Sequence, residues 1–114
     1  MRKIDKKIDN QLRESLTDAC ETALEKFTGF KWLTHVVSYP DFPKTLKIVC
    51  VFDTKDNLKS FMATNSRFEF SLLLSKKLVE NSVNIKNIAS HISYDTEEDC
   101  DKNHDGNWAA RLAK

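Results

Sequence analysis

The first quarter of the chain carries an amphipathic pattern that is long enough to constrain the whole fold. Apolar residues recur every three or four positions across residues 3–27, and charged residues occupy most of the positions between them. The spacing predicts a helix of about six or seven turns, which ends at Gly29. A helix of this kind needs a second layer on which to bury its apolar face. The apolar positions are Ile4, Ile8, Leu12, Leu16, Ala19, Ala23 and Phe27.

The following residues predict that second layer. Residues 30–39 are rich in β-branched and aromatic side chains, and residues 45–53 alternate an apolar face with a mixed one. Because the segment between them holds two prolines, we expect a turn there and an antiparallel hairpin. Two helices over residues 55–63 and 67–81 and a third strand over residues 85–95 complete the pattern. The residues expected to face the helices from the sheet are Leu46, Ile48, Cys50, Phe52, Ile88 and Ile92.

The order helix, strand, strand, helix, helix, strand indicates an α+β fold. Its simplest form is a three-stranded sheet with helices packed on one face. The chain has 114 residues, which is the size of one domain, so we expect residues 1–114 to form a single domain. Residues 96–114 are polar and form a C-terminal appendage. There Gly106 is expected to break a short helix, and Trp108 and Leu112 share one helical face.

Composition and motifs argue against most cofactor-dependent enzymes. The chain has only two glycines, Gly29 and Gly106, whereas nucleotide-binding loops need several at fixed spacing. Residues 101–106 match the first half of a calcium loop, but Leu112 stands where the loop needs a bidentate glutamate. We therefore expect a non-enzymatic protein with no cofactor and no metal.

The cysteines and the apolar stretches indicate a cytoplasmic protein. Cys20, Cys50 and Cys100 are odd in number and far apart, which is typical of free thiols in a reducing compartment. The first residues are charged and lack the apolar region of a signal peptide. The apolar stretches are too short to span a bilayer, so we expect no membrane partner.

Positive charge gathers near the start of the first predicted helix. With a net charge of +1, the chain lacks the basic excess of most nucleic-acid modules, so such a surface must be a local patch. A solvated helix face explains the pattern simply, and a footprint on a phosphate backbone is the functional alternative. The candidate nucleic-acid contacts are Arg2, Lys3, Lys6, Lys7 and Arg67.

The first predicted strand indicates a protein interface, because it places apolar groups on both of its faces. A sheet covered by helices on one side only leaves one of these faces unprotected. A second copy, a partner protein or residues 108–112 could cover that face. The candidate interface residues are Trp32, Val37, Tyr39 and Trp108.

Over residues 3–95 the element order αββααβ resembles that of type II KH domains. Within that group the chain is similar to the ribosome-binding factor A family in its long first helix, hairpin, interrupted helix pair and last strand. The resemblance implies contact with RNA or with the ribosome. KH domains clamp a nucleic-acid backbone with G-x-x-G between the paired helices. Residues 63–66 stand at that place, and they read Ala-Thr-Asn-Ser.

The chain also looks like small bacterial proteins that carry a Fis-family regulator label. That label implies a C-terminal helix-turn-helix, but residues 101–114 have room for one helix broken by glycine. Two functions follow from the sequence. The first is a protein-interaction or self-associating domain, and the alternative is a KH-like module that binds nucleic acid or the ribosome.

Overall fold

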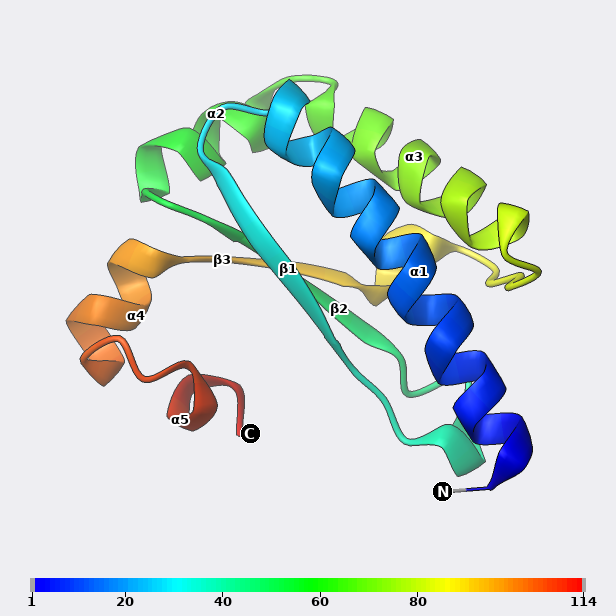
Figure 1. The fold of residues 1–114 in the computed structure, drawn as a ribbon. Coiled ribbons are helices and arrows are strands. Elements are labelled where there is room, and N and C mark those ends of the chain that lie inside the picture. Colours follow the sequence, from blue (N-terminus) through cyan, green and yellow to red (C-terminus); the bar gives the residue numbers. More distant parts are fainter. Residues whose placement is uncertain (1, 114) are drawn as a thin grey trace.

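The computed structural model describes residues 2–113 and has an α+β fold, as the sequence predicts (Figure 1). The boundaries of the first three helices agree with the prediction to within one residue at each end. The α-helices are α1 (Lys3–Lys26), α2 (Lys55–Ala63), α3 (Ser66–Glu80), α4 (Glu97–His104) and α5 (Trp108–Leu112). The strands are β1 (Phe30–Val36), β2 (Lys47–Phe52) and β3 (Ile92–Thr96), and two 3-10 helices are η1 (Tyr39–Asp41) and η2 (Ile88–His91).

The three strands form a mixed sheet with β2 at its centre. The expected hairpin is confirmed, because β1 runs antiparallel to β2 with Leu33 opposite Cys50. β3 runs parallel to β2, and Tyr94 lies opposite Cys50 on that side. A parallel pair needs a long crossover, which α2 and α3 supply on one face of the sheet.

The core lies between this face and the helices α1, α2 and α3 (Figure 1). Ile48, Cys50 and Phe52 of β2 are fully buried there. α1 and α3 pack along one another, and Ser15 on α1 donates a hydrogen bond to the carbonyl of Lys77 at 3.2 Å. Five aromatic rings from the helices, the strands and the C-terminal end of α1 pack against one another in the core, in edge-to-face or tilted arrangements. They are Phe27, Phe30, Phe52, Phe61 and Phe70.

The last strand is shorter than the sequence predicts. Residues 85–95 were expected to form one strand, but β3 begins at Ile92 and η2 precedes it. Asn87 has a φ of 53°, a left-handed conformation that a continuous strand cannot contain. Ile85 and Ile88 are nevertheless buried. Their apolar side chains therefore fill the core from a loop and a 3-10 turn, and not from a strand.

The C-terminal appendage lies against the other face of the sheet. α4 follows β3 directly, and α5 turns back toward the strands (Figure 1). A β-bulge between Phe30 and Trp32 places Phe30 on the helix-covered face and Trp32 on the opposite face. Trp32 meets Trp108 of α5 there, with ring centroids 4.9 Å apart. The sequence allowed three possible covers for the exposed face of this strand. Residues 108–112 are one of them, and they lie against Trp32.

Candidate functional site

The structure does not bring the five candidate nucleic-acid contacts together. Lys3, Lys6 and Lys7 are exposed on the first two turns of α1, and Arg2 forms an ion pair with Asp5 at 3.0 Å. Arg67 lies in the first turn of α3. α1 and α3 run antiparallel, since Lys26 at the end of α1 pairs with Glu69 near the start of α3. About 30 Å of helix therefore separates Arg67 from the lysines.

The four candidate interface residues take part in contacts within the chain. Trp32 and Trp108 stack edge to face across the outer side of the sheet. Val37 packs against the core, and the Tyr39 hydroxyl donates a hydrogen bond to Asp9 of α1. Trp32 and Trp108 therefore lie on one side of the sheet, and Val37 and Tyr39 belong to the helix-covered side.

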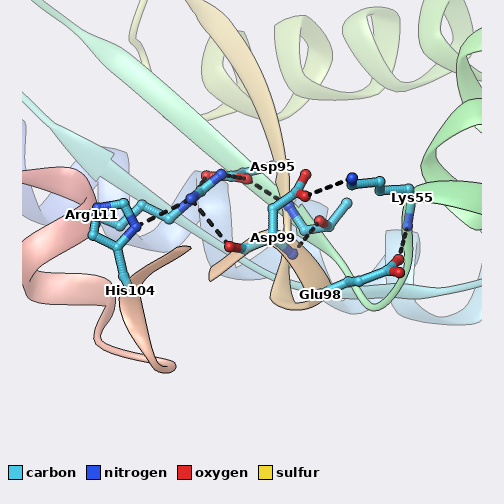
Figure 2. Close-up of polar contacts among 7 residues, drawn as sticks. Lys55, Asp95, Glu98, Asp99, His104 and Arg111 are labelled. Carbon is cyan, nitrogen blue, oxygen red and sulfur yellow. Dashed lines mark hydrogen bonds and ion pairs between the residues drawn. The ribbon is translucent and has the colours of Figure 1, made fainter. Parts of the chain in front are cut away.

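A polar network holds the C-terminal helices in place (Figure 2). Arg111 of α5 reaches back to Asp95 of β3 through two hydrogen bonds of 2.6 and 2.8 Å. One further nitrogen of Arg111 lies 3.2 Å from Nδ1 of His104. On the other side of Asp95, the Lys55 backbone donates to Glu98 at 2.8 Å. The network ties α2, β3, α4 and α5 together, and two ion pairs, Arg111 with Asp95 and Lys55 with Asp99, use most of its charges.

An open hollow of about 670 Å³ forms a groove beside α3. We call it the α3 groove. One wall is α3, and the other is formed by η2, β3 and the loop before them. Phe68 and Leu72 stand at its α3 rim with 63% and 56% of their surface exposed. The groove is lined by Met62, Arg67, Phe68, Ser71, Leu72, Ser75, Ile85, Asn87, Ile88, Ala89, Ile92 and Tyr94.

The electrostatic character of the α3 groove is weakly positive. Arg67 is the one charged residue in its lining, and no carboxylate lines it. Lys86 is exposed on the loop of the opposite wall. Tyr94 lies at the base, where burial raises the pKa of its hydroxyl and so keeps it a neutral hydrogen-bonding group. The groove can therefore accept apolar side chains together with one negative charge.

Sequence reasoning missed the α3 groove for an identifiable reason. The helical spacing of Phe70, Leu73, Leu74 and Leu78 predicts that these residues form the buried stripe of α3, and the structure buries three of the four. Phe68 and Leu72 are spaced four residues apart outside that stripe. Two large apolar residues at this spacing on the outer side of a helix indicate an exposed apolar surface, and this was the signal in the sequence that could have predicted the groove.

A second cluster surrounds Asp9 on α1. Its carboxylate accepts a hydrogen bond from Tyr39, pairs with Arg13 at 2.8 Å and lies 3.7 Å from Nε2 of His35. The hydrogen bond from Tyr39 and the charge of Arg13 lower the pKa of Asp9. These contacts fasten the first half of α1 to the end of β1. These contacts within the chain explain why the four side chains lie together, and no ligand is needed to explain the cluster.

The thiols are poorly suited to nucleophilic chemistry. Cys20 lines a hollow of about 260 Å³ together with Arg13 and His35. Burial raises the pKa of Cys20, and it does the same for the buried thiols of Cys50 and Cys100. A raised pKa keeps a thiol protonated at neutral pH, whereas the attacking species is the thiolate.

Within residues 2–113, no group of three or more His, Cys, Asp or Glu side chains is placed to hold a metal ion. No helix of that part of the chain is long and apolar enough to cross a membrane. Comparisons with protein-family models, curated proteins and solved structures gave no match for this chain.

Proposed function

We propose that this chain is a non-enzymatic protein-interaction domain that binds an amphipathic segment of a partner protein in the α3 groove. One observation carries the proposal: Phe68 and Leu72 are more than half exposed at the rim of a hollow that is itself lined mainly by apolar side chains. Single exposed apolar residues are ordinary on protein surfaces, but two of them at a concave apolar site mark a binding surface.

The lining of the groove defines the chemistry of the segment. An amphipathic helix presents apolar side chains at intervals of three and four residues, and it binds by laying this face into an apolar groove. Arg67 at one end favours a carboxylate in the segment, because a guanidinium binds a carboxylate with two hydrogen bonds. Ser71, Ser75 and Asn87 offer further hydrogen bonds to its backbone or polar side chains.

The test is a selection of displayed peptides on the wild-type protein, followed by calorimetry with the selected peptides. We expect the peptides to carry apolar residues at helical spacing and an acidic residue. Leu72→Asp should lower their affinity by at least about tenfold, because it places a charge against the apolar face of the peptide. Val79→Asp is the matched control, since Val79 is 60% exposed on the same helix but does not line the groove.

Two outcomes would contradict this function. One is a selection that yields no binder, and the other is a set of peptides that bind the wild type and both variants equally. Because Leu72 and Val79 are exposed, neither substitution should change the free energy of unfolding by more than about 1 kcal/mol. A loss of binding can therefore be assigned to the groove and not to unfolding.

A second candidate function, binding of single-stranded nucleic acid, is favoured by the position of Arg67. Arg67 follows the junction between α2 and α3 and also lines the α3 groove. Phe68 and Tyr94 supply aromatic faces there, and such faces stack on unpaired bases. The order of α1, β1, β2, α2, α3 and β3 is also the one that the resemblance to type II KH domains implies. The net charge of +1 makes this the weaker candidate.

A further inference from the structure

The outward face of α1 is divided into a basic half and an acidic half. α1 lies over the helix side of the sheet beside α3, and among residues 2–113 no other element covers its outer side (Figure 1). The first half of this face carries the exposed cations Lys3, Lys6, Lys7 and Arg13. The second half carries the exposed carboxylates Glu14, Asp18, Glu21 and Glu25.

This arrangement opposes what stabilises a single helix. The helix dipole favours negative charge near the N-terminus and positive charge near the C-terminus, and α1 has the reverse order along its exposed face. Like charges also lie four residues apart at Lys3 and Lys7 and at Glu21 and Glu25, where they repel each other. Within residues 2–113, Arg13 is the one member of the two halves that forms an ion pair, with Asp9. The stability of α1 alone therefore does not explain the pattern.

We propose that two copies of this chain associate through α1, antiparallel, with the basic half of each helix against the acidic half of the other. A two-fold axis that crosses α1 between Arg13 and Glu14 produces this pairing. Lys6 and Glu21 are equally far from such an axis, so each meets the other on the second copy. In a two-fold interface every contact occurs twice.

The same axis also accounts for an exposed apolar side chain. Leu24 is 50% exposed on α1 and lies as far from the axis as Lys3. The aliphatic stem of Lys3 on the second copy can therefore cover Leu24 while its ammonium group reaches Glu25. A second copy matches both halves of the face at once. A nucleic acid would meet the carboxylates of the second half, and an acidic protein would match the first half alone.

This interface is a different surface from the α3 groove, so it does not depend on the function proposed for that groove. Since its contacts are charged and exposed, association should weaken as added salt screens them. The measurement is the molar mass of the full chain by sedimentation equilibrium over a range of protein and salt concentrations. We expect dimers at low salt and at least about a tenfold rise in the dissociation constant at several times physiological ionic strength.

Charge reversal gives the decisive test. An acidic variant carries Lys3→Glu, Lys6→Glu and Lys7→Glu, and a basic variant carries Asp18→Lys, Glu21→Lys and Glu25→Lys. Each alone should dimerise at least about tenfold more weakly than the wild type, because like charges then face each other. An equimolar mixture of the two variants should form a heterodimer. A chain with all six changes should dimerise again, and its α1 has the charge order that the helix dipole favours.

A wild type that stays monomeric at low salt would overturn the proposal, as would a dimer that survives in both variants. A mixture of the two variants that fails to associate would also overturn it. Circular dichroism of every variant checks that the chain is folded, and all six positions are exposed. If the lysines instead bind phosphates, the acidic variant loses oligonucleotide binding while the mixture shows no heterodimer.

Discussion

Arg111 and Asp95 join the last helix to the last strand through two parallel hydrogen bonds. Nε of Arg111 lies 2.6 Å from Oδ2 of Asp95, and Nη2 lies 2.8 Å from Oδ1. Both side chains are largely buried, so solvent screens the pair less than it screens an ion pair on the open surface. The hydrogen bonds that Arg111 donates to Asp95 also raise the pKa of Arg111, which keeps the guanidinium charged.

We predict that Arg111→Ala detaches α5 from the sheet. Asp95 then loses its partner, and we expect a loss of about 1–3 kcal/mol in the free energy of unfolding, as for other hydrogen bonds to charged groups. Urea titration followed by tryptophan fluorescence measures the free energy of unfolding. The fluorescence of the folded variant should also differ from that of the wild type, because Trp32 loses its contact with Trp108. Arg111→Lys is the control, since it keeps the charge but not the two-point geometry, and should cost less. Unchanged stability and fluorescence in Arg111→Ala would show that the pair does not hold α5.

Gly29 provides a prediction about the turn between α1 and β1. Its φ is 84°, as expected for the left-handed position after a helix. A Cβ atom there would lie 2.6 Å from Cβ of Asn57 and 2.6 Å from Oδ1 of Asp53. Gly29→Ala therefore combines backbone strain with a clash, and should lower the free energy of unfolding by about 2–4 kcal/mol.

Gly106→Ala is the matched control for Gly29→Ala. Gly106 has a φ of 77°, but its nearest contact would be Oδ1 of Asp101 at 3.0 Å. This substitution keeps the backbone strain and largely removes the clash, so about 1–2 kcal/mol is expected. Thermal unfolding of the two variants side by side compares them. Equal losses would mean that the approach of Asp53 and Asn57 to Gly29 is not restrictive.

The contact between Asp9 and Tyr39 should make stability depend on pH in two ranges. Burial and the hydrogen bond to Asp9 raise the pKa of Tyr39 to about 12 from an ordinary value near 10. Between these two values the unfolded chain has lost the proton that the folded chain keeps. The stability from this group is therefore complete below about pH 10 and is lost as the pH rises through about 12.

In the acid range, stability should change with pH in the opposite direction, so that it rises as the pH rises. The hydrogen bond from Tyr39 lowers the pKa of Asp9, so the unfolded chain binds a proton more readily than the folded one. Stability from Asp9 is present above its unfolded pKa and is lost as the pH falls through the lowered value. Urea midpoints measured from acid to alkaline pH should show both effects in the wild type. Tyr39→Phe should flatten the alkaline side and weaken the acid side, and a profile identical to the wild type would contradict this linkage.

The sequence predicted the elements with regular periodicity and missed those set by contacts between distant residues. Seven apolar residues at helical spacing were enough for α1, and two strand-like segments joined by a turn with two prolines were enough to pair β1 with β2. Alternation alone could not place Trp32 on the face opposite Phe30, because the bulge that turns it away depends on pairing with β2. Alternation failed at Ile85 and Ile88, whose apolar side chains are buried without a strand.

The candidate sites were less predictable, because sites depend on which surfaces remain uncovered. Trp32 and Trp108 are 76 positions apart, and nothing local indicates that each covers the other. Lys3 and Arg67 are both basic, but the antiparallel packing of α1 on α3 puts them at opposite ends of the helix layer. The α3 groove lies between α3 and the segment of η2 and β3, which only the assembled fold brings together.

A salt titration separates the two functions considered for the α3 groove. Binding through phosphates releases counterions, so contact with about four phosphates gives a slope of about −3 in a plot of log affinity against log salt concentration. Because its charges nearly cancel and Arg67 lies far from the lysines of α1, we predict that the protein binds mixed single-stranded oligonucleotides weakly at physiological salt. Fluorescence anisotropy measures this directly. Submicromolar binding with a steep slope, lost in Arg67→Glu but retained in Lys76→Glu, would make nucleic acid the ligand of the α3 groove.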